Sequence, residues 1–117
     1  LDSVLDGAHV DYIKYDVEGC EREALLGSAD TIRRCLPELR LSLYHRPCDM
    51  WELPLLLHDI CPEYRMHLFR PRCLPAWETE LSALTGASSD NNPLLCAKPH
   101  GGAHSARLDK AVKIDYN

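Results

Sequence analysis

Two strand-like segments separated by a helix-like stretch constrain the fold of this chain more than any other feature. Residues 10–17 are rich in β-branched and aromatic side chains and run into Gly19, which favours a sharp exit turn. Residues 39–45 alternate leucine with polar side chains, as a strand with one buried face does. The stretch 20–36 between them has apolar residues near helical spacing and predicts two short helices, the second capped by Ser28.

The following segments continue this alternation of strands and helices. Asp49 and Glu52 have the spacing of a capping box and predict a helix over residues 53–60. Residues 64–69 and 78–84 alternate again and predict a closing antiparallel pair. The order strand, helix, strand, helix, strand predicts an α/β fold in which crossover helices join parallel strands.

The domain organisation follows from where this pattern stops. Residues 1–84 predict one small domain, whereas residues 85–117 are small, polar and without a period, and we expect a mostly disordered tail there. The longest apolar run, residues 53–57, is far shorter than the ~20 residues that a membrane span needs. The chain opens with Leu1 and carries no signal-peptide pattern, so we expect it to be a piece of a longer protein.

Charge and cysteine usage narrow the classes of partner. The formal net charge is -5, with 18 acidic and 13 basic residues, so the phosphate backbone of a nucleic acid would be repelled. The six cysteines form no C-x-x-C pair, and their spacing predicts no zinc site. We therefore expect free, buried thiols, no bound metal and, because nothing marks export, a location in the cytoplasm.

Several segments together resemble one protein family. The run I-K-Y-D-V-E-G-C-E at residues 13–21 resembles the I-K-x-D-x-E-G-x-E signature of the FkbM family of S-adenosylmethionine-dependent methyltransferases. The runs A-L-L-G-S-A-D-T-I at residues 24–32 and P-E-L-R-L-S-L-Y-H-R-P at residues 37–47 resemble the segments that follow in that family. Shorter matches at 49–54, Tyr64 and 77–81 extend the resemblance over about residues 1–84.

The resemblance implies a class I, Rossmann-like methyltransferase fold, in which a seven-stranded sheet lies between helices and the last strand is antiparallel. Only the second half of that fold is matched, so we expect a partial fold with a terminal antiparallel strand pair. The family's first strand leads into a glycine-rich turn that contacts S-adenosylmethionine, but none of the six glycines here forms G-x-G after a strand. The family is enzymatic, but the main cofactor-binding half is expected to be missing from this chain.

Candidate catalytic residues stand at the carboxyl ends of the two predicted parallel strands, where ligands of such sheets bind. Asp16 ends the first strand and His45 ends the second, and we predict that they accept the proton of a substrate hydroxyl. Asp16 is also predicted to contact the cofactor, and Lys14 to anchor Asp16 or a ligand. The alternatives are a turn-forming aspartate and a histidine that caps a loop.

Other residues of the signature have weaker assignments. Glu18 is predicted to contact substrate or to interact with a helix dipole. Trp51 and Trp77 are predicted to line a substrate pocket, with packing in the core as the alternative. Glu21 is expected on a solvated face or in an ion pair with a neighbouring arginine.

These observations predict part of an O-methyltransferase that methylates a hydroxyl of a sugar or polyketide-like small molecule. The alternative is a catalytically inactive remnant that acts as an interaction module through Trp51, Trp77 and an exposed sheet edge, which would favour self-association. A third reading treats Asp16 and Glu18 as ligands of a divalent metal ion, since hard cations prefer carboxylates, but two carboxylates alone make a poor site.

Overall fold

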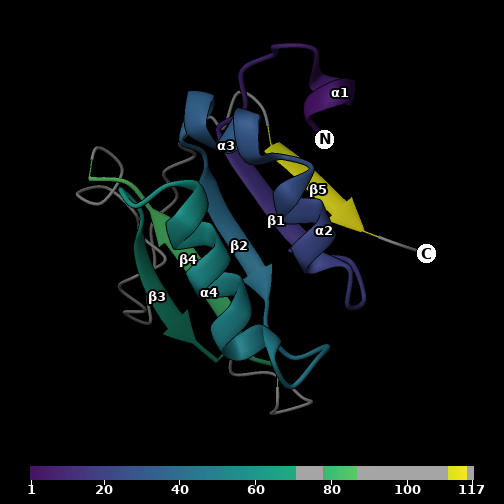
Figure 1. Cartoon of the computed structure of the whole chain (residues 1–117), viewed down its shortest axis with the longest axis vertical. Coiled ribbons are helices and arrows are strands. Elements are labelled where there is room, and N and C mark those ends of the chain that lie inside the picture. Colours follow the sequence, from purple (N-terminus) through teal and green to yellow (C-terminus); the bar gives the residue numbers. More distant parts are fainter. Residues whose placement is uncertain (71–77, 87–110, 116–117) are drawn as a thin grey trace, which may run out of the picture.

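The computed structural model describes residues 1–70, 78–86 and 111–115, the last as a strand without its side chains. The chain is a mixed α/β fold (Figure 1). Its elements in order are α1 (Asp2–Leu5), β1 (Tyr12–Asp16), α2 (Glu21–Leu26), α3 (Ala29–Cys35), β2 (Glu38–Ser42), α4 (Asp49–Ile60), β3 (Arg65–Phe69), β4 (Glu80–Leu84) and β5 (Ala111–Asp115).

The strands form one sheet in the order β3-β4-β2-β1-β5. β1 is parallel to β2 and to β5, whereas β4 is antiparallel to both β2 and β3. The predicted parallel strands, crossover helices and closing antiparallel pair are therefore confirmed. Both strands are shorter than the sequence predicts. β1 lies inside the predicted segment 10–17, whereas β2 begins one residue before the predicted segment 39–45.

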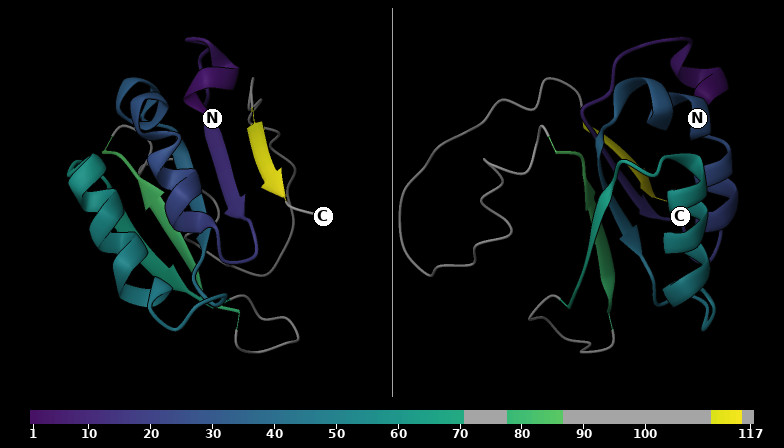
Figure 2. Two further views of the ribbon diagram at one scale, coloured as in Figure 1. Left: turned by 45° about the vertical axis from the view of Figure 1, so that its right-hand side comes forward. Right: turned by 60° about the vertical axis from the view of Figure 1, so that its left-hand side comes forward.

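Three helices cover one face of this sheet. Figure 2 shows α2, α3 and α4 side by side over that face. Alternate strand residues point into the space beneath them and are almost fully buried, which accounts for the period-two pattern in the sequence. The residues of this core include Ile13, Tyr15, Leu39, Leu41, Leu81 and Ala83 from the strands and Leu25, Ile32, Leu53 and Leu57 from the helices.

The two helices predicted over residues 20–36 are confirmed as α2 and α3, and Ser28 stands at the predicted cap position of α3, but its side chain makes no capping hydrogen bond. Ser28 precedes α3, yet its hydroxyl donates to a carbonyl of α2 and accepts from the Tyr15 hydroxyl, 2.6 Å away. The cap comes instead from Asp2, whose carboxylate accepts the backbone N–H groups of Asp30 and Thr31 at 3.1 and 2.8 Å. The serine is buried between two elements, so its side chain is held away from the helix start.

α4 begins four residues earlier than the sequence predicts. Asp49 lies in its first turn, almost fully buried, and its carboxylate accepts the backbone N–H of Arg46 at 2.9 Å. This hydrogen bond ties the helix start to the loop that follows β2. Burial raises the pKa of the Asp49 carboxyl despite this hydrogen bond.

β5 is a correction to the expected tail. Residues 111–115 pair with β1 in parallel register, Tyr12 with Ala111 through Asp16 with Asp115. A five-residue run is too short for its alternation to stand out within a polar segment, and pairing satisfies the backbone groups along the β1 edge. The edge whose exposure suggested self-association is thus paired. Residues 87–110 and 116–117 lie outside the described part, so the domain boundary at residue 84 stays a prediction.

Two further expectations concern cysteines and membranes. The four cysteines in the described residues, Cys20, Cys35, Cys48 and Cys61, are free thiols, as predicted, but only Cys61 is buried and Cys20 is exposed. Within the described residues, none of the helices combines the length and the apolar character that crossing a bilayer requires.

Candidate functional site

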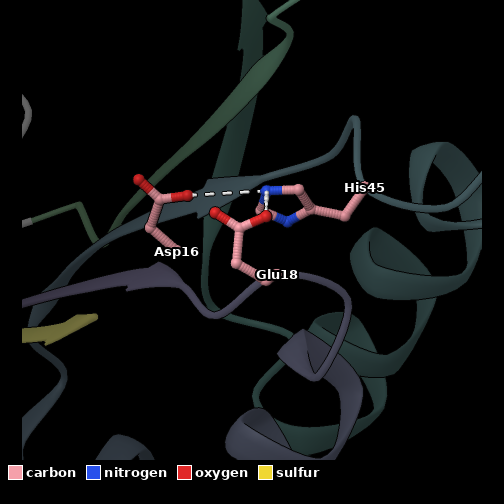
Figure 3. A group of neighbouring side chains, drawn as sticks. All are labelled: Asp16, Glu18 and His45. Carbon is pink, nitrogen blue, oxygen red and sulfur yellow. Dashed lines mark ion pairs between the residues drawn. The ribbon is translucent and has the colours of Figure 1, made fainter. Parts of the chain in front are cut away.

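Three polar side chains meet where β1 and β2 end. Asp16 is the last residue of β1, and His45 lies three residues beyond the end of β2. His45 Nε2 is 3.7 Å from Asp16 Oδ1 and 3.5 Å from Glu18 Oε2 (Figure 3). Because parallel strands end at the same edge of a sheet, two residues far apart in sequence become neighbours. We refer to these three residues as the Asp16–Glu18–His45 cluster.

The turn between β1 and α2 places Glu18 in this cluster. Glu18 has φ +51° and Gly19 has φ +96°, both in the left-handed region. A Cβ added at Gly19 would lie 3.3 Å from Arg46 Nε, so the turn needs glycine for both its backbone angle and its close approach to the next loop. The left-handed turn carries Glu18 above the end of β1, where its side chain is 72% exposed and faces His45.

Glu21 holds His45 in place from the buried side. Glu21 Oε1 accepts the backbone N–H of Val17 at 3.0 Å and lies 2.6 Å from His45 Nδ1. Because a carboxylate oxygen only accepts hydrogen bonds, Nδ1 carries the proton of this hydrogen bond, and Nε2 on the other side of the ring faces Asp16 and Glu18. His45 Nε2 is buried, and within the described part of the chain it has no hydrogen-bond partner.

The expectation for Glu21 is therefore wrong. The sequence suggested a solvated face or an ion pair with an arginine, whereas Glu21 is 1% exposed and bonded to the histidine. The signal that points to this role is its place in the first turn of the helix that follows β1. There it faces the loop after the neighbouring parallel strand, and only the tertiary structure shows which residue of that loop it meets.

Asp16 is held by three donors. Lys14 Nζ donates to Asp16 Oδ2 at 3.0 Å, which confirms Lys14 as an anchor of this carboxylate. Two donors that sequence reasoning missed, the Ser42 hydroxyl at 3.0 Å and the Tyr44 hydroxyl at 3.3 Å, donate to Oδ1. Partial burial by itself raises the pKa of the Asp16 carboxyl, but these hydrogen bonds outweigh it and hold the pKa below its ordinary value. Asp16 is thus a carboxylate at neutral pH.

A pocket with a volume of about 370 Å³ adjoins the cluster. His45 belongs to its lining, together with Leu43, Tyr44, Arg46, Pro47, Met50 and Thr79. Trp51 is not among its lining residues and is 56% exposed on α4, so it is not a core residue, and its substrate role stays a prediction. Trp77 lies outside the described residues.

The sequence profile of the FkbM methyltransferase domain matches residues 1–71, which is more than half of the chain. This chain belongs to the FkbM methyltransferase family. The crystal structure of a methyltransferase FkbM from Methylobacillus flagellatus KT is similar to it, with 34% identity and a TM-score of 0.64. That similarity covers 71% of this chain and 22% of the solved chain, so this FkbM-type chain spans little more than a fifth of its solved relative. The search of curated proteins found no match.

The whole Asp16–Glu18–His45 cluster and Glu21 lie inside the region that matches the FkbM domain. The mixed α/β fold of this FkbM chain is likewise shared with its solved relative. The Rossmann-like arrangement of the complete domain stays a prediction.

Proposed function

We propose that this chain forms the acceptor-binding part of an S-adenosylmethionine-dependent O-methyltransferase, which methylates a hydroxyl of a sugar or polyketide-like small molecule. Membership of the FkbM family supports methyl transfer. The observation that carries the choice of a hydroxyl is the Asp16–Glu18–His45 cluster, which gathers two carboxylates and an imidazole ring beside a pocket.

Methylation of an alcohol needs such a cluster because the hydroxyl must lose its proton. The oxygen lone pair forms the new C–O bond, the proton leaves the oxygen, and the methyl group leaves its donor without the bonding electrons. Fixing the hydroxyl in line with the methyl group is the main contribution of the site. A group that takes up the proton adds roughly 10²–10⁴-fold in rate. Asp16 and His45 keep their predicted catalytic role in this proposal, with Glu21 as a positioning residue.

S-adenosylmethionine, the cofactor generally used by this family, would supply the methyl group as a sulfonium. The chain has no G-x-G sequence, and the N–H that follows β1, that of Val17, is taken by Glu21. The described residues therefore do not make up an adenosyl-binding site, and the contact of Asp16 with the cofactor stays a prediction.

The pocket beside His45 suits a small acceptor. Its volume of about 370 Å³ falls in the range of roughly 300–1,000 Å³ that ligand pockets occupy. Leu43, Pro47 and Met50 give it apolar walls, whereas Tyr44, His45 and Arg46 offer polar contacts. This combination fits a molecule with both a carbon skeleton and hydroxyl groups, as in a sugar or a polyketide.

An inactive interaction module remains the second candidate, and exposed apolar side chains on α4 favour it. Trp51 is 56% exposed and Leu55, one helical turn later, is 63% exposed. Such a pair on one face of a surface helix resembles a contact site for another protein. Methyl transfer by the assay below separates the two candidates, because a module without catalysis releases no S-adenosylhomocysteine.

The test is methyl transfer by the chain and by a version extended with the sequence that flanks it in its gene. Each is incubated with S-adenosylmethionine and panels of sugars and polyketide alcohols, and S-adenosylhomocysteine is quantified. We expect transfer with at least one alcohol and a loss of about 10²-fold or more in Asp16→Asn. The matched control, Asp59→Asn on the exposed surface of α4, should leave the rate unchanged. No transfer by either version, or full activity of Asp16→Asn, would contradict the proposal.

A further inference from the structure

We propose that the Asp16–Glu18–His45 cluster binds one divalent transition-metal ion, such as Mn²⁺, Co²⁺ or Zn²⁺. The ligand atoms are a carboxylate oxygen of Asp16, a carboxylate oxygen of Glu18 and Nε2 of His45 (Figure 3). Binding of the ion is inferred from these residues alone, whereas its part in methyl transfer rests on the proposed function.

The distances between the ligand atoms fit a shared ion. Nε2 lies 3.5 Å from Glu18 Oε2 and 3.7 Å from Asp16 Oδ1, and one atom from each side chain lies within 4.8 Å of the others. An ion with nitrogen and oxygen ligands at about 2.0–2.2 Å separates adjacent ligands by roughly 3–3.6 Å. The two distances from Nε2 are close to this range but longer than the 2.7–3.2 Å of an N–H···O hydrogen bond. The side chains therefore need only small shifts to coordinate one ion.

The hydrogen bond that His45 makes through Nδ1 orients Nε2 as a metal ligand. Its side chain is only 8% exposed, and its Nε2 has no hydrogen-bond partner in the described residues although it is directed at two carboxylates. Histidines that bind metals almost always donate their second ring N–H to a carboxylate or carbonyl, and Glu21 accepts the Nδ1 proton here at 2.6 Å. Ligating carboxylates are hydrogen-bonded in turn, as Asp16 is by Ser42.

The negative charge of the cluster favours a bound cation, and the imidazole ligand favours a transition-metal ion. The carboxylates of Asp16, Glu18 and Glu21 surround one imidazole, while Lys14 is the cation bonded to Asp16. A divalent ion would offset this excess of negative charge. Imidazole is a ligand of transition metals, whereas Mg²⁺ and Ca²⁺ prefer sites made of oxygen alone. The sequence expectation of no metal depended on two carboxylates, and the structure adds the third ligand.

On the proposed function, the ion would activate the acceptor. A hydroxyl that enters the coordination sphere has its O–H bond weakened, in the way that Zn²⁺ lowers the pKa of water from 15.7 to about 7. The oxygen keeps the bonding electrons for attack on the methyl group. With the ion bound, Nε2 of His45 is a ligand and no longer accepts the proton. The proton leaves instead to the carboxylate oxygen of Glu18 that is not bound to the ion, and this side chain, which is 72% exposed, passes it to water.

The test measures the binding of Mn²⁺ to the purified chain. Binding is detected as the loss of the electron paramagnetic resonance signal of the free ion. We expect one ion per chain, with ¹⁴N coupling from an imidazole in the pulsed spectrum. Glu18→Gln should weaken binding at least 10-fold without unfolding the chain, because the Glu18 side chain is largely exposed. Glu63→Gln removes the same charge from another exposed position and should bind Mn²⁺ as the wild type does.

Three outcomes would overturn the metal site: no Mn²⁺ binding at millimolar concentration, equal binding by Glu18→Gln and Glu63→Gln, or bound Mn²⁺ without ¹⁴N coupling. The methyl-transfer assay with and without a chelator keeps this inference separate from the proposed function. Transfer that persists with a chelator, in a protein that binds no Mn²⁺, refutes the metal and leaves the methyltransferase. Mn²⁺ binding with the expected variant pattern, in a protein that transfers no methyl group, supports the metal site and refutes the function.

Discussion

Replacement of Glu21 tests how the site is held together. Glu21 is 1% exposed, and its Oε1 accepts two hydrogen bonds, from the Val17 backbone N–H and from His45 Nδ1. Glu21→Ala removes the acceptor of both donors and leaves them buried without partners. Glu21→Gln keeps a carbonyl oxygen of the same reach but removes the charge. The two variants therefore separate loss of the hydrogen bonds from loss of the charge.

The magnitudes follow from the buried groups. Each buried donor left without a partner costs about 1–3 kcal/mol, so Glu21→Ala should lower the free energy of unfolding by about 2–6 kcal/mol. A hydrogen bond to a charged group contributes about 1 kcal/mol more to stability than one between neutral groups. The free energy of unfolding of Glu21→Gln should therefore fall by this amount. A chain of 117 residues has a total stability of roughly 6–18 kcal/mol, so the glutamine variant stays folded.

Urea denaturation followed by circular dichroism measures these losses. At a slope of about 2 kcal/mol/M, the midpoint should fall by about 1–3 M in Glu21→Ala and by about 0.5 M in Glu21→Gln. Glu23→Ala is the matched control, since Glu23 is exposed on the same helix and its loss should change stability by less than about 0.5 kcal/mol. The ¹⁵N shifts of His45 should report a proton on Nδ1 in the wild type. If Glu21→Ala unfolds at the urea concentration of the Glu23→Ala control, the argument that Glu21 holds His45 is wrong.

Three further predictions concern the scaffold. Tyr15→Phe removes the hydroxyl that donates to Ser28 and should cost about 1 kcal/mol in urea unfolding, whereas an unchanged midpoint would show that this hydrogen bond adds nothing. Partial burial by itself raises the pKa of the Asp2 carboxyl, but its hydrogen bonds to the start of α3 lower it below its ordinary value. Asp2 therefore stabilises the fold above about pH 4 and loses this effect as the pH falls through its lowered pKa. Asp2→Asn should be less stable than the wild type at pH 7 and as stable as the wild type near pH 2. A difference in stability that stays constant with pH would contradict this. Gly19→Ala should cost about 1–2 kcal/mol in the same assay, because of its positive φ and the 3.3 Å approach to Arg46, and a neutral result would refute the turn argument.

The strands that carry the site were predictable because their pattern is local. In β1 and β2, each residue that faces the helices is followed by one that faces away, so the period of two is visible in the sequence. The residues at the ends of such strands are natural candidates for a site, which is why the sequence predicts Asp16 and His45 as site residues. The same local reasoning did not find the side chain that caps α3, because Asp2 lies 28 residues before Asp30, the first residue whose backbone N–H it accepts.

By itself the sequence determined the succession of strands and helices, the FkbM family and the two strand ends at which polar residues gather. Only the tertiary structure decided that Glu21 is buried against His45, that Glu18 turns back over the end of β1, and that residues 111–115 lie beside β1. The physical reason is that hydrophobic periodicity and turn chemistry act between residues a few positions apart. Contacts such as that between Glu21 and His45 depend instead on how separate elements pack, and this is set by the core as a whole.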